Sequence, residues 1–143
     1  MNNHLALFLG IFVATSLPSI GMANDALSPV RIMSNGSVYI DPATIKHDGD
    51  NAYVWSVWDH SSQQLNVFDE PYRSVRLYNE YNCTNRTMRL LEVMEFEQSK
   101  GEGDPIRIHD GSESVAKPIP SGTVAEEIFT QICKGNLRRI RDY

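Results

Sequence analysis

The feature that most constrains this chain is a pair of long strand candidates that ends in a cysteine. Tyr72–Cys83 and Arg86–Gln98 both alternate apolar and polar residues, and only Thr84-Asn85 separates them. This pattern predicts an antiparallel hairpin with a tight turn. The first strand ends at Cys83, and the other cysteine of the chain, Cys133, lies near the C-terminus. The hairpin therefore offers a point near its turn to which a distant segment can be tied.

The register of this hairpin predicts which side chains share a face. With Thr84-Asn85 as the turn, Tyr81 lies opposite Met88 and Leu77 lies opposite Glu92, and opposed residues point to the same side of a sheet. The predicted core face consists of Val75, Leu77, Tyr81, Cys83, Met88, Leu90, Met94 and Phe96. Glu92 does not suit that face, and a β-bulge at this position would explain it.

The opposite face of the hairpin is the candidate binding surface. The same register pairs Glu80 with Arg89, which have complementary charges. It gathers aromatic, apolar and Arg residues of the kind that anchor interfaces, with Tyr72 beside them. The candidate binding residues are Arg76, Tyr78, Leu91 and Val93. Two other possibilities remain open, because this face could be covered by the chain's own loops or by a second copy in a homodimer.

The N-terminus predicts a cleaved secretory signal. Leu5–Ala14 is an apolar segment too short to span a bilayer, and Gly21-Met22-Ala23 supplies small residues at a cleavage position. We therefore expect a signal peptide at residues 1–23, one mature domain at 24–143, and no membrane span after cleavage. The chain would be exported to the periplasm, the cell surface or the medium.

Export makes one disulfide the simplest use of two cysteines. Cys133 lies at the end of a predicted amphipathic helix, which begins with a capping box formed by Thr123 and Glu126. A Cys83–Cys133 bond would tie this helix to the hairpin and contribute about 4 kcal/mol in the chain-entropy model. The alternative is two buried free thiols.

The rest of the chain predicts four further strands. They are Val30–Met33, Val38–Ile40, Ala52–Asp59 and Pro105–His109. In the third, Tyr53 and Trp55 alternate with Val54 and Trp58, so both faces are apolar and the strand should be central and covered on both sides. The polar stretch His60–Pro71 reads as a connection long enough to be functional or mobile.

Composition and motifs argue against nucleic-acid binding and catalysis. The formal net charge is −5, whereas phosphate recognition needs a clustered basic surface. No zinc, Walker or nucleophile-elbow motif is present, and no cofactor or metal is expected. Three neighbouring pairs are weak candidates for a dyad or metal site and more simply belong to polar turns: His47-Asp48, Asp59-His60 and His109-Asp110.

Several short motifs, taken in order, resemble the surface-adhesin protein E family of small exported domains in Gram-negative bacteria. The matching positions are Tyr39-Ile40-Asp41, Thr44-Ile45, Val54-Trp55 with Asp59, Tyr72-Arg73-Ser74, Glu80–Cys83, Arg86, Arg89, Gly101, Gly103, Pro118–Thr123 and Cys133. The resemblance implies an α+β fold: an antiparallel sheet of about six strands with one C-terminal helix packed on it and tied by a disulfide.

The same resemblance implies a function without catalysis. Members are adhesins for host extracellular-matrix glycoproteins of the vitronectin and laminin class, so we expect an exported protein-binding module. The alternative is a periplasmic structural or stress-related protein of unknown ligand that forms a homodimer through the candidate face.

Overall fold

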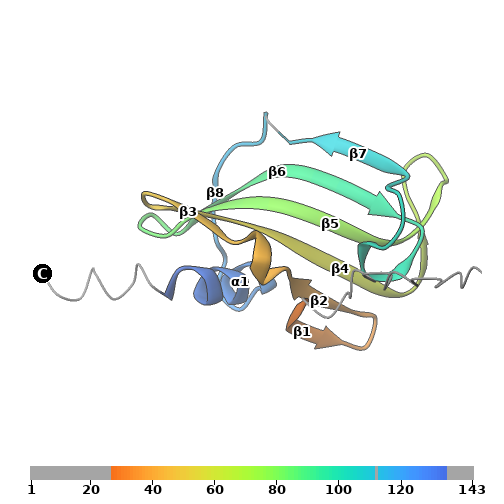
Figure 1. Ribbon diagram of the computed structural model, residues 1–143, viewed down its shortest axis with the longest axis horizontal. Helices are drawn as coiled ribbons and strands as arrows, with labels where there is room; N and C mark the ends of the chain where they lie inside the picture. The colour runs from red at the N-terminus through yellow and green to blue at the C-terminus, as the bar shows by residue number, and fades with distance from the viewer. Residues whose placement is uncertain (1–26, 112, 135–143) are drawn as a thin grey trace, which may run out of the picture.

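The computed structural model describes residues 27–111 and 113–134, which form an antiparallel sheet with one helix packed against it (Figure 1). The sheet has eight strands in these residues, in the order β1-β2-β4-β5-β6-β7, with β3 paired to β4 and β8 paired to β6. The strands are β1 (Ser28–Met33), β2 (Gly36–Ile40), β3 (Lys46–Asp48), β4 (Asn51–Leu65), β5 (Pro71–Asn82), β6 (Thr87–Phe96), β7 (Arg107–Asp110) and β8 (Lys117–Pro118).

The predicted α+β class is confirmed. Six strands form the main path of the sheet, and the two short strands β3 and β8 lie beside it. The helix is α1 (Val124–Ile132), and two 3-10 turns, η2 (Pro42–Thr44) and η3 (Ser99–Gly101), connect strands. The predicted signal peptide at residues 1–23 lies outside the described residues.

Strand β4 is central, as its sequence predicts. It pairs with β2 and β3 along one edge and with β5 along the other. Ala52 and Val54 are completely buried on the side of α1, whereas Trp55 lies opposite Tyr78 on the other side. This position suits the apolar residues on both faces of β4, because neither face of the strand is fully open to water.

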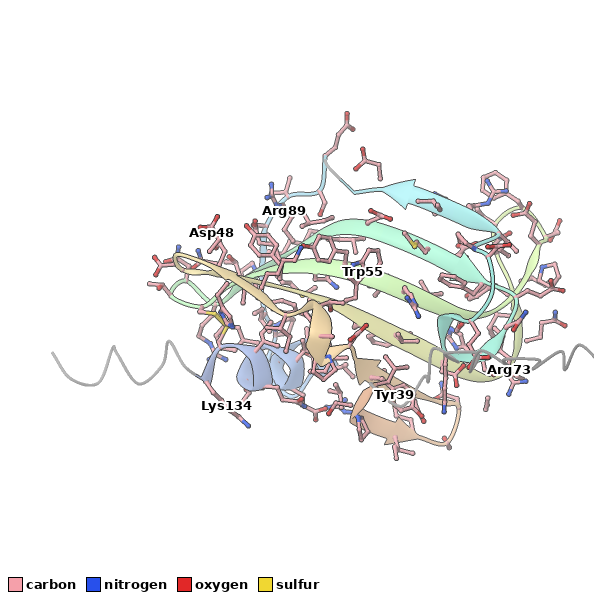
Figure 2. All side chains as sticks on the ribbon, viewed as in Figure 1. Tyr39, Asp48, Trp55, Arg73, Arg89 and Lys134 are labelled. Carbon is pink, nitrogen blue, oxygen red and sulfur yellow. A yellow bond between two sulfur atoms is a disulfide. The ribbon has the colours of Figure 1, made fainter. Side chains whose placement is uncertain are left out.

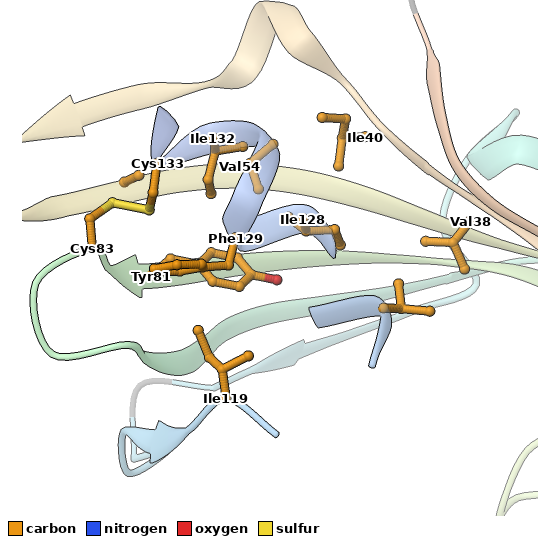
Figure 3. Packing of buried hydrophobic residues seen from close by; sticks show 12 residues of the cluster. Val38, Ile40, Val54, Tyr81, Cys83, Ile119, Ile128, Phe129, Ile132 and Cys133 are labelled. Carbon is orange, nitrogen blue, oxygen red and sulfur yellow. A yellow bond between two sulfur atoms is a disulfide. The ribbon is translucent and has the colours of Figure 1, made fainter. Parts of the chain in front are cut away.

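The main core lies between one end of the sheet and α1 (Figure 3). Phe129 packs beside Tyr81 and is completely buried, and Ile128 and Ile132 are nearly so. The core cluster consists of Val38, Ile40, Ala52, Val54, Tyr81, Cys83, Ile119, Val124, Ile128, Phe129, Ile132 and Cys133. Each large apolar side chain buried in this way stabilises the fold by about 1.5–3 kcal/mol before its entropy loss is counted.

The predicted disulfide is present. Cys83 and Cys133 are bonded, with 5.6 Å between their Cα atoms and a sequence separation of 50 (Figure 3). Cys83 directly follows β5, and Cys133 caps the C-terminal end of α1. The bond therefore fastens the end of the helix to the end of the hairpin.

The start of α1 is held by a variant of the predicted capping box. The Thr123 hydroxyl accepts a hydrogen bond from the Glu126 backbone N–H at 3.3 Å. The Glu126 carboxylate accepts a bond from the Gly122 N–H at 2.8 Å, one residue before the position that a standard capping box uses. The bond to Thr123 satisfies a donor that the first helical turn would otherwise leave unpaired, and the bond from Gly122 ties the Glu126 side chain to the residue before the cap.

Two ion pairs hold the helix across its exposed side. Arg31 of β1 pairs with Glu127 at 2.6 Å, and Arg86 pairs with Glu126 at 2.8 Å. The Arg86 guanidinium also lies 4.7 Å from the centre of the Phe129 ring. Because these groups are partly exposed, each pair contributes little energy alone, but together they fix how the helix lies on the sheet.

The predicted hairpin register is correct near the turn and wrong farther along. Tyr81 lies opposite Met88 and Glu80 opposite Arg89, as predicted. Between Asn79 and Tyr78 the register shifts by one residue, because Asn79 pairs with Leu90 and Tyr78 pairs with Glu92. Leu91 is the extra residue of a β-bulge, one position before the place where the misfit of Glu92 suggested one.

The bulge moves the far half of β6 to the opposite side from the one predicted. Met94 lies opposite Arg76 and Phe96 opposite Ser74, so both residues lie on the side away from α1. Val93 lies opposite Leu77 and therefore shares the side of α1. The prediction that Met94 and Phe96 belong to the core beneath the helix is wrong, since one inserted residue inverts all later side chains.

The connection between β4 and β5 is shorter than predicted. Strand β4 continues to Leu65, so most of the polar stretch His60–Pro71 forms a two-stranded arm and only residues 66–70 form the loop. The pairing is irregular between Asp59 and Gln64. Hydrophobic alternation does not reveal this arm, because its side chains do not have one buried face.

The disulfide gives the first prediction. Replacing Cys133 by Ser should lower the free energy of unfolding by about 4 kcal/mol, because the unfolded chain loses a constraint. Urea unfolding followed by tryptophan fluorescence measures this loss, and reduced wild-type protein should unfold at nearly the same urea concentration as the variant. Equal midpoints for the variant and the oxidised wild type would contradict it.

Candidate binding face

The side of the sheet opposite α1, here called the outer face, carries a row of three aromatic side chains. Tyr53 and Trp55 of β4 flank Tyr78 of β5, and Figure 2 places Trp55 near the middle of the sheet. The Trp55 and Tyr78 rings stack with centroids 5.0 Å apart, and the Tyr53 and Tyr78 rings are tilted at 6.3 Å. All three side chains are half-buried, so the row is rigid and part of it still meets solvent.

One end of the row is closed by a polar network. The Tyr53 hydroxyl donates to the Glu80 carboxylate at 2.9 Å, and Arg89 pairs with the same carboxylate at 3.1 Å. The hydrogen bond to Glu80, together with partial burial, raises the pKa of Tyr53 above its ordinary value. The predicted Glu80–Arg89 pair is therefore confirmed and holds the rim of the outer face.

Two connecting segments border the outer face. The segment with η2 is anchored to Trp55, whose backbone N–H donates to the Thr44 hydroxyl at 3.1 Å. The segment with η3 is anchored to β5, since the Ser74 hydroxyl accepts from the Gly101 N–H at 2.7 Å and donates to the Gln98 carbonyl at 2.5 Å. The aromatic row is therefore framed on two sides by backbone that is hydrogen-bonded to the sheet.

Arg76 lies beside η3 and is held by packing. Its guanidinium lies 5.6 Å from the centre of the Phe96 ring, which is 3 % exposed. The backbone of Gly101, at φ +68°, approaches so closely that an added Cβ would overlap the Arg76 Nε atom. Only glycine fits here, because any side chain would collide with Arg76 and would also strain the backbone.

Two shallow hollows lie on either side of Trp55. One has a volume of about 290 Å³ and is lined by Asp41, Thr44, Trp55, Arg76 and Met94. The other, of about 190 Å³, is lined by Ala43, Thr44, Lys46, Trp55 and Tyr78. The two hollows share Thr44 and Trp55 in their linings, so they lie next to each other beside the aromatic row.

The structure brings together only part of the predicted binding set. Arg76 and Tyr78 lie on the outer face, as predicted. Val93 lies on the side of α1, and Leu91 is the unpaired bulge residue, so the predicted common face of all four residues is wrong. Sequence reasoning did not include Trp55 or Met94, although the alternation of β4 already placed Trp55 on one face with Tyr53.

The loop of the β4–β5 arm is a second exposed feature. Leu65 is 65 % exposed, Val67 91 % and Phe68 57 %, which is unusual for large apolar side chains. The Asn66 amide holds the loop, because it accepts from the Phe68 and Glu70 N–H groups and donates to the Glu95 carboxylate at 2.7 Å. The three apolar side chains are thus presented on a fixed loop.

Glu70 ties this loop to the edge strand β7. Its carboxylate accepts from Arg107 at 2.6 Å, and the Arg107 guanidinium lies 3.9 Å from the centre of the Phe68 ring. Hydrogen bonds from Asn66 and then from Arg107 lower the pKa of Glu70 below its ordinary value of 4.5. The loop therefore depends on an ionised carboxylate.

The three His-Asp pairs do not assemble into a metal site in the described part of the chain. His109 lies 3.8 Å from Glu95, and Asp59 accepts a hydrogen bond from the Lys100 N–H. Over residues 27–111 and 113–134, no group of three or more His, Cys, Asp or Glu side chains is placed to hold a metal ion.

The family model for surface-adhesin protein E matches residues 28–134. The chain belongs to the surface-adhesin protein E family. The match covers the sheet and α1, and it confirms the resemblance read from the short motifs. No protein with a curated description matches the chain.

Solved structures of a family member have the same fold. One crystal form of Haemophilus influenzae protein E aligns with a TM-score of 0.60 and 20 % identity, covering 75 % of this chain and 93 % of that one. Protein E from non-typeable Haemophilus influenzae aligns with a TM-score of 0.58 and 17 % identity, covering 86 % of this chain and 84 % of that one. At these identities the likeness establishes the fold.

Family membership makes this chain an adhesin-like surface protein, exported or held at the surface. Among the residues that the structure describes, no helix is both long and apolar enough to cross a membrane. The family's adhesin character directs attention to exposed surfaces, and the outer face and the arm loop are the two described above.

Substituting Gly101 by Ala should disturb the border of the outer face beside Arg76. The new methyl group would displace Arg76, and the positive φ would add strain, so we expect a loss of about 1–2 kcal/mol in unfolding free energy. Thermal unfolding measures the loss, and the NMR signal of the Arg76 Nε–H reports the displacement. Gly49→Ala is the control, because that turn glycine also has a positive φ but has open space around it. A Gly101→Ala variant with an unmoved Arg76 signal would contradict the packing described.

Acid should loosen the arm loop. The lowered pKa of Glu70 means that its ionised form stabilises the folded loop above pH 4.5, and this contribution is lost as the pH falls through the lower folded value. NMR titration of the Asn66 and Phe68 amides from pH 7 to pH 2 should show this transition, and Glu70→Gln should show the loosened state already at pH 7. Replacement of the exposed Glu97 by Gln should leave both amide signals unchanged, and an unaffected loop in Glu70→Gln would contradict the role of Glu70.

Proposed function

We propose that this protein is a non-catalytic adhesin module that binds host extracellular-matrix glycoproteins of the vitronectin and laminin class through its outer face. The observation that carries the proposal is the framed aromatic row with Arg76 at its side, in a member of an adhesin family. The proposed contact residues are Arg76, Tyr78, Trp55 and Met94.

The chemistry of the outer face supports a protein partner. Half-buried aromatic side chains and an Arg are the residue types that contribute most to protein interfaces, and their rings lose little entropy when a partner orders them. Trp55 and Tyr78 already restrain each other by stacking. The side of α1 is a poorer candidate at its helical end, where the helix buries the apolar residues.

The arm loop supplies a second contact. Val67 and Phe68 project from a loop in which the Phe68 and Glu70 N–H groups donate to the Asn66 side chain. A partner can therefore cover the loop without burying these two donors unpaired. A partner that touched only this loop would bury too little area for stable binding. We therefore assign the loop a supporting role.

The test is binding of the mature domain to immobilised vitronectin and laminin. Arg76→Met keeps the aliphatic packing of the side chain but removes the charge, and Tyr78→Ala removes one ring of the row. Each should weaken binding at least about tenfold, the effect of losing one interface anchor of ~1.4 kcal/mol or more. Because Tyr78→Ala also removes a stacking partner of Trp55, a circular dichroism melt must show that the variant is folded.

Arg73→Ala is the matched control, because Arg73 lies on the same strand and points to the other side of the sheet. It should bind like the wild type. Wild-type affinity in Arg76→Met and Tyr78→Ala would contradict the proposed face. Analytical ultracentrifugation tests the alternative, since a homodimer that depends on Tyr78 would identify the outer face as a self-association surface of a structural protein.

A further inference from the structure

We propose that the hollow beside Arg76 receives the carboxylate of a single Asp or Glu side chain from the protein partner, with an apolar neighbour of that side chain against Trp55 and Met94. This inference rests on the proposed function, because it names the chemistry by which the same face recognises a partner segment. Four features of the site carry it.

The first feature is an arginine without an acidic partner. Of the arginines that the structure describes, Arg31, Arg86, Arg89 and Arg107 each form an ion pair with a carboxylate. Arg73 is exposed and donates to a backbone carbonyl. Arg76 alone in that group forms no hydrogen bond or ion pair with a described residue, and its Nε atom is buried without an acceptor. An unpaired guanidinium that is partly removed from water favours binding of an anion.

The second feature is that Arg76 is already oriented. Gly101 packs against its stem and Nε atom, and the Phe96 ring lies beneath the guanidinium. A side chain held in this way loses little rotamer entropy when a ligand binds. The planar guanidinium also matches a carboxylate through two parallel hydrogen bonds, a geometry that a lysine does not provide.

The third feature is the shape of the hollow. Its volume of about 290 Å³ is enough for a few side-chain groups and too small for a folded element, and Trp55 and Met94 supply apolar walls. An apolar side chain next to the acid would exclude water from these walls. Exclusion of water lowers the local dielectric constant and strengthens the charge interaction with Arg76.

The fourth feature is a negative charge that limits the ligand to one acid. Asp41 borders the same hollow, and its carboxylate is held in place by a hydrogen bond from the Ala43 N–H at 3.1 Å. The chain as a whole carries a formal charge of −5. Both oppose a polyanion such as a sulfated sugar chain, because its additional charges would face Asp41. A lone Asp or Glu in a peptide segment is the carboxylate that suits this surface.

The experiment uses two capped dipeptides that differ only in charge. Acetyl-phenylalanyl-glutamate amide and its neutral counterpart with glutamine are titrated into the isotopically labelled mature domain, and NMR follows the Trp55 indole N–H and the Arg76 Nε–H. We expect the acidic dipeptide to shift both signals and to bind about tenfold or more tightly than the neutral one, as a charge-assisted hydrogen bond implies.

Arg76→Gln should weaken binding of the acidic dipeptide to the level of the neutral one, and Arg73→Gln should leave it unchanged. Asp41→Asn should strengthen binding of the acidic dipeptide, because it removes the repelling charge. Equal affinity for the two dipeptides, or wild-type binding by Arg76→Gln, would overturn the proposal. Glucuronate is the third probe: if it binds as tightly as the acidic dipeptide, the assignment to a protein segment is wrong.

This experiment is independent of matrix glycoproteins. Failure of the dipeptides alone would remove the carboxylate anchor and leave the outer face as an interface of another kind. Failure of vitronectin and laminin binding, with the dipeptides still bound at Arg76, would instead overturn the proposed partners and keep the anchor.

Discussion

The attachment of α1 to the sheet is the interaction on which the rest of the structure depends. The helix has nine residues, which is too short for a stable helix by itself in water. It persists because its apolar face fills the core, because the Cys83–Cys133 bond fastens its C-terminal end, and because Arg31 and Arg86 pair with its acidic residues. Since these ties all hold α1 to one side of the sheet, they leave the other side to short connecting segments.

The outer face owes its character to this incomplete cover. The η2 segment is fastened by the hydrogen bond from the Trp55 N–H to Thr44, and the η3 segment by the bond from the Gly101 N–H to Ser74. Gly101 also packs against the stem of Arg76. Neither segment provides an acidic partner for Arg76. The result is a rigid depression in which aromatic rings and a fixed positive charge remain available. Such preorganisation suits recognition, because a partner does not have to order the side chains that it meets.

Much of the fold could be predicted from the sequence. Most of its determinants are patterns within a single strand or helix, and the disulfide joins the chain's two cysteines. The alternation of apolar and polar residues defines β4 and β5, and the capping residues define the start of α1. Two cysteines allow only one disulfide within the chain. The candidate site could be predicted only in part. Arg76 and Tyr78 were placed correctly from the strand period, but Val93 was not, because the bulge at Leu91 shifts the register of β6. A bulge depends on how two strands pack in the whole sheet, and Glu92 was its only trace in the sequence.

The sequence by itself determined that this chain forms an antiparallel sheet with a terminal helix, and its ordered motifs indicated the adhesin family. Only the tertiary structure decided how the Tyr72–Gln98 hairpin uses its two faces. The bulge carries Met94 and Phe96 to the outer face, and Gly101, distant from Arg76 in sequence, orients that arginine beside Trp55. The physical reason is that side-chain period is a property of one strand, whereas a binding hollow is made by segments that meet only after the chain has folded.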